Sequence, residues 1–589
     1  MAKGEFPVER SVSEKFRPVK TSYGASSFDV IRQDGRTYAD KTRFIETLEE
    51  AFGLYPVVVR PRRFGKSVFA TMLASYYDMN EARNFEANFC GTYIYAHRTP
   101  LAGRFRVLPF DFSGLSSAAD LPREFLQQVR SALDNFARRY PFDGAREILG
   151  AAYDTAGTLL DAFFNGAAAV FGKTLYVIID EYDQFANQVL AADKEAFKEI
   201  TASNGFLKDF YAKLKAGTKT AVSRTFITGV TAVTLDSMTS GFNIADVVTT
   251  DPLMADAFGF TGAEVRQLIR ETIDPAACGM TEDEVFLRMK DYYNGYRFSD
   301  GTEETVFNAA MCLYYLRNLA TRQREPSDMT DRSCDADMDK LHHILSYGRN
   351  PEFLKKTVED ALAGRAVALS HLSQGINFNS KNELSEEDVL SLLFYMGYLT
   401  FSRDSESRLV CPNKAVREQF FRMYFQYLSD VGAVYFSAND LREEFFAMQE
   451  GDIEPFVRSV RDRLQEKIGV HGLSKLSEMV LQVGLLMAAD KNYAYQVTAE
   501  TESHGRGFTD LLFLPRAECA SRCRCAFVLE LKYLAKGKAT EKAIAAKVEE
   551  AKAQLARYAK GANLASVGAL KKIIVVFAGL DVVRFINVS

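Results

Sequence analysis

The stretch VVVRPRRFGKSVFATML, residues 57–73, joins an apolar, β-branched run to a helical pattern through a basic turn. The run predicts a buried strand, because β-branched side chains favour extended backbone. After the turn, apolar side chains repeat at helical spacing on one face: Val68, Phe69, Met72, Leu73 and Tyr76. A strand that passes directly into a helix is the unit of α/β folds with a mainly parallel sheet. The junction therefore favours an α/β arrangement for this region.

Further short apolar runs alternate with helical patterns up to about residue 260. The predicted strands are Tyr55–Arg60, Arg106–Phe112, Thr174–Asp180 and Thr225–Val230. This alternation predicts an α/β domain with a mainly parallel sheet over residues 27–260. Residues 1–26 are polar with scattered charges, and we expect them to form an N-terminal arm.

The pattern changes twice after the first domain. Residues 261–472 are largely helical in pattern, as in LSEEDVLSLLFYMGYLTF, and they predict an all-α middle region that packs on the first domain. Strand patterns return in YAYQVTAE, FTDLLFLP and CAFVLELKY, followed by a long helix and a last strand, KIIVVFAG. Residues 473–589 are therefore predicted to form a second, smaller α/β domain.

The chain has 589 residues, enough for three or four folding units. Its first residues, MAKGEFPVER, contain no apolar segment of the secretory type, and the longest apolar stretches are too short to span a bilayer. Eight cysteines in so long a chain do not make a disulfide scaffold. We therefore expect a cytoplasmic protein with no membrane partner, and the oligomeric state is left open.

The basic turn contains Gly65, Lys66 and Ser67 between the strand and the helix. Backbone N–H groups at a helix N-terminus bind phosphate, a lysine there can reach the β- and γ-phosphates, and a serine hydroxyl can hold Mg²⁺. Arg60 stands where the phosphate-binding loop G-x-x-x-x-G-K-[ST] has its first glycine. The alternative is a basic strand–helix corner without a ligand.

The strand in TLYVIIDEYDQ ends in Asp180 and Glu181. Two carboxylates at the end of a buried strand are costly unless they meet a cation or donors. In an ATPase, Asp180 would bind the Mg²⁺ shell and Glu181 would polarise the attacking water. Thr228 ends a further strand and would lie near the γ-phosphate, and Arg63 is our choice among the arginines for a phosphate contact. Thr228 could equally be an ordinary strand residue, and the arginines could pair with acidic neighbours.

Together these segments resemble the bacterial AAA-ATPase-like family. The resemblance rests on SSFDVIRQDGRTYADKT, RPRRFGKS, VIIDEYD, FITGV and YYNGYRF, and it covers about the whole chain. The family carries arginine in place of the first glycine of the loop, and it couples an ATPase domain to a C-terminal nuclease-like domain. The resemblance therefore implies ATP and Mg²⁺ as cofactors. YYNGYRF, Tyr292–Phe298, is a marker of the family for which the sequence suggests no chemical role.

A second set of candidate residues lies in GRGFTDLLFLP and FVLELKY. Glu530 and Lys532 are two residues apart on one predicted strand and therefore share a face, whereas Leu529 and Leu531 face the other way. If the two strands pair as a hairpin, Asp510 joins them. Two carboxylates can hold Mg²⁺ and a lysine can orient or deprotonate a water, which suits phosphodiester hydrolysis. The alternative is a salt bridge between Glu530 and Lys532.

This arrangement resembles the restriction-endonuclease-like fold, with its pattern D…(D/E)-x-K. Gln554 and Tyr558 form the Q-x-x-x-Y helix that lines the active site in one branch of that fold. Glu502 is a candidate for a further metal ligand, with Glu500 as the competing choice. Residues 481–589 contain 16 Lys and Arg against 10 Asp and Glu, a net charge of +6 in a chain of net charge −5. By charge alone, this excess fits a solvated lysine-rich helix better than a polyanion partner. Together with the D…(D/E)-x-K pattern, it supports a nucleic-acid partner, DNA or RNA.

The sequence thus predicts a P-loop NTPase parallel-sheet domain, a helical middle region and a C-terminal restriction-endonuclease-like α/β domain. The functional hypothesis is an ATP-hydrolysing protein coupled to a metal-dependent nuclease domain. The alternative hypothesis is an ATP-dependent conformational switch whose inert nuclease-like domain docks a partner.

Overall fold

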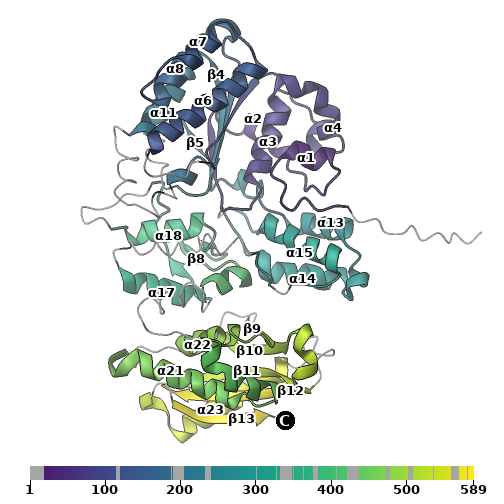
Figure 1. Cartoon of the computed structure of the whole chain (residues 1–589), viewed down its shortest axis with the longest axis vertical. Helices are drawn as coiled ribbons and strands as arrows, with labels where there is room; N and C mark the ends of the chain where they lie inside the picture. The colour runs from purple at the N-terminus through teal and green to yellow at the C-terminus, as the bar shows by residue number, and fades with distance from the viewer. Residues whose placement is uncertain are drawn as a thin grey trace, which may run out of the picture. The chain divides into compact units, whose positions relative to one another are not determined.

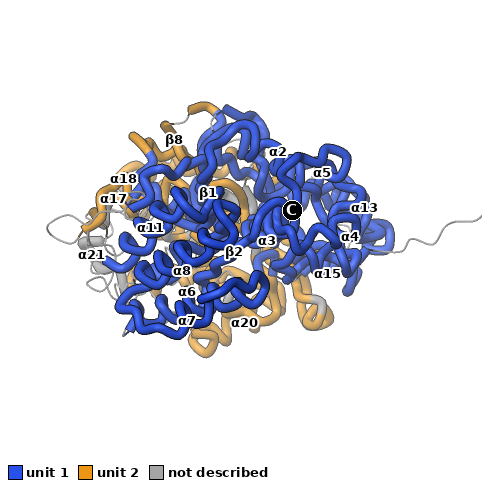
Figure 2. Tube along the Cα trace, turned by 90° about the horizontal axis from the view of Figure 1, so that it is seen from above, with its two compact units in different colours: residues 1–336, 372–377, 390–403 blue, residues 337–371, 378–389, 404–589 orange. Residues whose placement is uncertain are grey.

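The computed structural model (Figure 1) describes the chain with gaps. The described residues are 19–114, 120–186, 189, 205–232, 241–299, 301–326, 328–331, 348, 350–362, 364–375, 383–405, 407–420, 437–472, 478–501, 508–534, 536–558, 569–579 and 581–588. The chain divides into two compact units, coloured in Figure 2. The first comprises residues 1–336, 372–377 and 390–403, and the second comprises residues 337–371, 378–389 and 404–589.

The first unit contains a five-stranded parallel sheet in the order β2-β3-β4-β1-β5. Its strands are β1 (Pro56–Val59), β2 (Arg106–Asp111), β3 (Leu175–Asp180), β4 (Val222–Gly229) and β5 (Asp246–Val247). The four strands predicted from apolar runs are all present, and β4 begins three residues earlier than predicted. The two-residue strand β5 was missed, because so short a segment carries no periodic pattern.

Helices cover both sides of this sheet (Figure 1). On one side lie α6 (Leu121–Arg139), α7 (Ala145–Gly150), α8 (Ala156–Phe171) and α11 (Phe206–Gly217). On the other side lie α1 (Phe28–Gln33), α2 (Arg43–Glu50), α3 (Lys66–Tyr77) and α4 (Phe85–Phe89), with α5 (Tyr93–Ala96) next to α2 and α4. Strand β3 is buried along its apolar length because it is covered from both sides, which explains why its sequence is continuously apolar.

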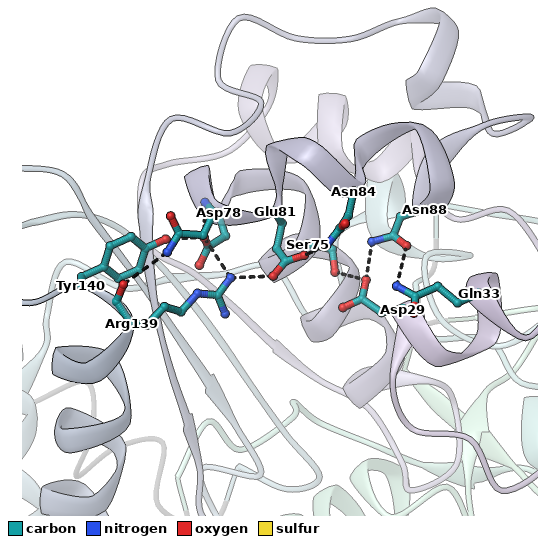
Figure 3. Close-up of polar contacts among 10 residues, drawn as sticks. Asp29, Gln33, Ser75, Asp78, Glu81, Asn84, Asn88, Arg139 and Tyr140 are labelled. Atoms are coloured by element: carbon teal, nitrogen blue, oxygen red, sulfur yellow. Dashed lines mark hydrogen bonds and ion pairs between the residues drawn. The ribbon is translucent and has the colours of Figure 1, made fainter.

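A polar network fixes the C-terminal end of α3 (Figure 3). The carboxylate of Asp78, directly after the helix, accepts hydrogen bonds from the Tyr140 hydroxyl and the Asn80 amide and lies 3.1 Å from an Arg139 guanidinium nitrogen. Arg139 also bonds Glu81 at 2.7 Å. Because Arg139 and Tyr140 end α6, the network ties helices from opposite sides of the sheet.

The middle part of the chain is mainly helical, as predicted. Its helices are α13 (Gly262–Thr272), α14 (Glu282–Tyr293), α15 (Ala309–Arg322), α17 (Pro351–Leu362), α18 (Glu386–Tyr395), α20 (Arg442–Gln449) and α21 (Glu454–Gly472). The expectation that it is all-α is wrong in detail, because it also contains the short strands β6 (Val367–Ala368), β7 (Thr400–Phe401) and β8 (Arg408–Val410). Capping boxes at Thr261 and Thr281 begin α13 and α14. The domain boundaries at residues 260 and 472 stay predictions.

The second unit contains a mixed sheet in the order β13-β12-β11-β10-β9. Its strands are β9 (Tyr495–Thr501), β10 (Phe508–Pro515), β11 (Cys525–Leu534), β12 (Ala569–Ala578) and β13 (Asp581–Val588). Strands β11 and β12 are parallel and are joined through α23 (Glu541–Tyr558), while the other pairs are antiparallel. Helix α22 (Glu478–Asp490) precedes the sheet. KIIVVFAG was predicted as the last strand, but β13 follows it.

Helix α23 packs on one face of this sheet through an apolar cluster. The cluster comprises Leu512, Val528, Ile544, Val548, Ala551, Leu555, Ile574 and Val576. Since Val528 and Glu530 are two residues apart on β11, Glu530 lies on the face that α23 covers. Among the described residues, no helix has both the length and the apolar character that a membrane span requires.

Candidate functional site

The turn between β1 and α3 has a strained backbone. Gly65 is the N-cap of α3 and has a φ of 92°, in the left-handed region that glycine adopts without cost. Arg63, two residues earlier, has a φ of 72°, which a non-glycine residue rarely adopts. Strained residues of this kind gather at ligand sites, where the surrounding structure holds them in place.

The sheet brings the predicted Lys66 and the predicted Glu181 to the same edge. The Lys66 ammonium lies 3.8 Å from Glu181 Oε1 and donates a hydrogen bond of 3.2 Å to the Pro61 carbonyl. Lys66 is only 3% exposed. Glu181 follows β3 directly, and β4 separates β3 from β1 in the sheet. The two sequence segments that predicted an ATP site therefore meet, although each residue's role stays a prediction.

Burial dominates the electrostatics of the two carboxyls. It raises the pKa of Asp180, while a hydrogen bond from the Ser67 hydroxyl and the charge of Lys66 act in the opposite direction. Burial also raises the pKa of Glu181, and Lys66 again opposes the shift. Glu181 has a φ of 53°, and within the described part of the chain its Oε2 is buried without a hydrogen-bond donor. Such an atom fits a site that takes up a cation or a donor.

Thr228 lies on β4 opposite Val58 of β1 and is fully buried. Its hydroxyl has no hydrogen-bond partner among the residues that the structure describes. Its carbonyl accepts a hydrogen bond of 3.2 Å from the Tyr182 amide, next to Glu181. The structure thus places Thr228 on the strand between β1 and β3, and its proximity to phosphate stays a prediction.

Asp183 was missed by the sequence analysis. Its carboxylate is fully buried and accepts hydrogen bonds from the Val230 amide at 2.9 Å, the Thr231 amide at 2.6 Å and the Thr231 hydroxyl at 2.7 Å. A Cβ on Gly229 would lie 2.3 Å from Asp183 Oδ1, so only glycine fits there. Asp183 therefore joins the loop after β3 to the loop after β4. The sequence signal that could have identified Asp183 is its place as the third acidic residue of IIDEYD, after Asp180 and Glu181.

In the second unit, the predicted residues lie on strands that pair with each other. Asp510 of β10 pairs with Glu530 of β11 and, on its other side, with Glu500 of β9. The predicted hairpin is therefore present. Glu500, the competing choice, is thus at the register position next to Asp510, whereas Glu502 lies outside the described residues.

Glu530 and Lys532 form a buried ion pair beneath α23. Lys532 Nζ lies 2.7 Å from Glu530 Oε1, and the side chains are 3% and 0% exposed, respectively. Over the described ranges, no donor makes a hydrogen bond of proper geometry to either Glu530 oxygen. A fully buried carboxylate with such poor hydrogen bonding is costly, because one nearby ammonium does not replace its hydration shell.

Helix α23 contributes a further carboxylate that sequence analysis missed. Lys532 Nζ lies 3.5 Å from Glu550 Oε1. Partial burial acts to raise the pKa of Glu550, but a hydrogen bond from Lys547 and the charge of Lys532 outweigh it and lower that pKa. Gln554 lies one turn further along α23, and its Oε1 is buried with no partner in the described segments. Tyr558 is the last residue of the helix.

A metal site is not already assembled in the described residues. In this part of the chain, three or more His, Cys, Asp or Glu side chains are nowhere close enough together to hold a metal ion. Glu530, with two poorly satisfied oxygens, nevertheless fits a divalent cation by the chemistry of its donors. The assignment of metal ligands therefore stays a prediction.

Comparisons with known proteins match the two ends of the chain separately. Residues 22–239 match a family model described as "Predicted AAA-ATPase", and residues 477–585 match one described as "PD-(D/E)XK nuclease superfamily". A protein of Azotobacter chroococcum mcd 1, described as "Uncharacterized protein in vnfD 5'region", is 28% identical over 294 residues. That match covers 49% of this chain, and the chain spans only about half (50%) of that relative.

One solved structure, the Aeropyrum pernix ORC1 protein in complex with DNA, was also matched. Its sequence identity to this chain is 12%, and its TM-score is 0.25. The match covers 66% of this chain and 93% of that chain.

Proposed function

Because residues 22–239 match the predicted AAA-ATPase model and residues 477–585 match the PD-(D/E)XK nuclease superfamily model, we propose that this protein hydrolyses ATP and couples that cycle to metal-dependent cleavage of nucleic acid. The observation that carries the proposal is the meeting of the Gly65–Ser67 turn with Asp180 and Glu181 at one edge of the sheet. The pairing of Asp510 with Glu530 supports the nuclease half.

At the ATP site, the amides at the start of α3 and the Lys66 ammonium bind the β- and γ-phosphates. Ser67 and Asp180 hold Mg²⁺, which when bound neutralises charge on the triphosphate. Glu181 orients the attacking water and accepts its proton. The unsatisfied oxygens of Glu181 and Thr228 support this assignment, because a γ-phosphate and its water would supply their missing partners. Arg63 contacts phosphate.

At the nuclease site, Asp510 and Glu530 hold a divalent cation, which when bound neutralises charge on the scissile phosphate. Lys532 orients the attacking water, and Gln554 lines the site with Tyr558. The buried, poorly hydrogen-bonded carboxylate of Glu530 supports this assignment. The net charge of +6 over residues 481–589 favours a polyanionic substrate, DNA or RNA.

The test uses the full chain and two variants. Lys66→Ala is expected to reduce ATP turnover by about 100-fold or more, because it removes the charge that meets the developing phosphate charge. Asp510→Ala is expected to abolish Mg²⁺-dependent cleavage of DNA and RNA while ATP turnover stays within about twofold. Lys173→Ala and Glu518→Ala, at exposed positions, are the matched controls. Cleavage by Asp510→Ala at the rate of the unaltered protein would refute the nuclease assignment.

A second candidate function is an ATP-dependent switch whose nuclease-like domain only docks a partner. The 2.7 Å contact between Lys532 and Glu530 favours it, because the two charges partly satisfy each other without a metal. Mg²⁺- and Mn²⁺-dependent cleavage assays on single- and double-stranded DNA and RNA distinguish the two functions. Persistent absence of cleavage alongside ATP turnover would favour the switch.

A further inference from the structure

The segment Tyr292–Phe298 has no part in the proposed chemistry, yet it contacts the phosphate-binding turn. The Tyr296 ring lies 4.8 Å from the Phe64 ring and the Phe298 ring 5.3 Å from it, both at 83° to its plane. All three rings are buried. The rings of Tyr296 and Phe298 are nearly parallel to each other, so Phe64 meets both of them edge to face. We call Tyr296 and Phe298 the aromatic clip.

Arg60, at the position of the missing glycine, contacts the same clip. Its guanidinium lies 4.6 Å from the centre of the Phe298 ring and donates hydrogen bonds to the carbonyls of Thr249 and Met254. Arg60 is 1% exposed. Burial lowers the pKa of Arg60 to about 9, so the side chain is still charged at neutral pH and the contact is a cation–π interaction.

The backbone of the turn is also held from outside. The Gly259 amide donates to the Phe64 carbonyl at 2.9 Å, and the Ala310 amide donates to the Arg63 carbonyl at 3.1 Å. A Cβ on Gly259 would lie 2.7 Å from the Phe307 carbonyl oxygen and 3.0 Å from the Phe64 ring, so a larger residue would displace the turn. These contacts surround Arg63, whose backbone is strained.

The clip itself is anchored on its other side. The Arg297 amide donates to the Thr400 hydroxyl at 2.6 Å, and that hydroxyl donates to the Arg297 carbonyl at 2.7 Å. The Arg297 guanidinium donates to the carbonyls of Ser402 and Arg403. Alternation along an extended segment puts Tyr296 and Phe298 on the side of the turn and Arg297 on the side of residues 400–403.

From these contacts we propose that Arg60, Tyr296 and Phe298 are positioning residues of the nucleotide site. They hold the Arg60–Ser67 turn in the conformation that receives the triphosphate. A loop with glycine at its first position relies on local backbone freedom, whereas this loop relies on packing from a distant segment. The inference rests on the proposed binding of ATP at Lys66.

The main test compares two buried phenylalanines in the full chain. Phe298→Leu removes the nearer of the two rings that Arg60 contacts, the other being Phe258. Phe163→Leu removes an equally buried ring of α8 that contacts Phe136 and Phe142. The probe is a fluorescent ATP analogue titrated with Mg²⁺, together with the melting temperature. Phe298→Leu is expected to raise the Kd about tenfold, the scale of a buried cation–π contact together with its ring pairs. Phe163→Leu is expected to lower the melting temperature about as much as Phe298→Leu does, but to leave the Kd within about twofold of the unaltered protein's value.

Two further variants keep the inference testable if Phe298→Leu does not fold. Phe298→Tyr keeps the aromatic face and is expected to retain the Kd of the unaltered protein. Arg60→Lys keeps the charge but loses the planar fork, and it is expected to weaken binding about tenfold. If Arg60 and Phe298 act as a unit, combining Arg60→Lys with Phe298→Leu weakens binding little further than either change alone.

The outcomes separate this inference from the proposed function. Equal shifts of the Kd in Phe298→Leu and Phe163→Leu would show that the aromatic clip affects nucleotide binding no more than any buried ring does. That result would overturn the inference but leave the proposed binding of ATP standing. Fully additive effects of the Arg60 and Phe298 changes would overturn their action as a unit. Absence of binding by the unaltered protein, or undiminished binding by Lys66→Ala, would overturn the proposed function and the inference with it.

Discussion

At the scale of single residues, the carboxyls of Asp180 and Glu181 at the end of β3 show how burial and function compete. Burial raises the pKa of Glu181, and the nearby Asp183 and Asp180 raise it further, while Lys66 opposes the shift. A carboxyl with a raised pKa binds its proton more tightly in the folded than in the unfolded state. The contribution of Glu181 to the free energy of unfolding therefore falls as the pH rises above the ordinary glutamate pKa of 4.5. At neutral pH, ionised Glu181 costs stability.

We predict that Glu181→Gln, which mimics the protonated carboxyl, melts at a higher temperature than the unaltered protein at about pH 8. Each kcal/mol gained in the free energy of unfolding should raise the midpoint by about 2–4 °C for a domain of 150–250 residues. The gain should shrink as the pH falls towards the ordinary pKa of 4.5, because Glu181 of the unaltered protein then becomes protonated. Scanning calorimetry across this pH range measures the difference.

Glu303→Gln is the control for this prediction, because Glu303 is exposed. It should change the midpoint little at any pH. A lower midpoint for Glu181→Gln than for the unaltered protein at about pH 8 would show that the attraction of Lys66 outweighs the cost of burying the carboxylate.

At the scale of helices and strands, the order of the parallel strands assembles the ATP site. Strand β4, with Thr228 opposite Val58, lies between β1 and β3, and the turn after β1 contacts Asp180 and Glu181 at the end of β3. In an open parallel sheet, ligands bind beyond the carboxyl ends of the strands. Helix α3 starts at this edge, and the network around Asp78 fixes its other end.

We predict that Asp78→Ala lowers the free energy of unfolding by about 2–4 kcal/mol, because it leaves the buried Tyr140 hydroxyl and the Asn80 amide without their acceptor and removes one of the two acidic partners of Arg139. Asp134→Ala is the control, because it breaks an exposed pair with Arg138 within α6 and should cost only about 0.3–0.5 kcal/mol. Urea unfolding monitored by circular dichroism compares the two. Equal costs would show that the network around Asp78 does not stabilise α3.

Helix α23 has the corresponding role in the second unit. Its apolar face packs on the sheet next to Glu530, and Glu550 reaches Lys532 from the same helix. The covering helix explains why Glu530 is fully buried although it belongs to the candidate metal site. Gln554, predicted at the site from the Q-x-x-x-Y pattern, follows Glu550 on this helix by one turn.

At the scale of the whole molecule, charge is divided unevenly along the chain. Residues 481–589 carry a net charge of +6 in a chain of net charge −5. Positive charge that meets phosphates releases counterions, which makes binding depend on salt. The acidic remainder of the chain repels the same polyanion, so the C-terminal residues should dominate its binding.

We predict that the affinity of the full chain for DNA or RNA falls at least about tenfold between about 50 and 200 mM salt, as for two or more phosphate contacts. Changing the exposed Lys538 and Lys542 to Glu should weaken binding further and flatten the salt dependence. The same change at the exposed Lys173 and Lys219 of the first unit is the control. Fluorescence anisotropy measures both, and equal losses in the two double variants would contradict a C-terminal binding face.

Local features of the sequence were sufficient to predict several elements. Apolar, β-branched runs predicted four strands of the parallel sheet, because such side chains fit a strand buried on both faces. The spacing of Glu530 and Lys532 predicted their common face, and the hairpin that pairs Asp510 with Glu530 was also predicted. Strand β13 and the short strands of the middle region were missed, because their pairing depends on neighbours that are distant in the chain.

The sequence by itself determined where the chemistry-bearing residues stand on their strands and helices, since those positions follow from local periodicity and backbone preference. Only the tertiary structure decided which distant groups meet them. Asp183 joins the loops after β3 and β4, Glu550 reaches Lys532, and Phe298 packs over Arg60 beside Phe64. Contacts of this kind leave no periodic pattern, because each depends on how strands and helices from separate parts of the chain pack together.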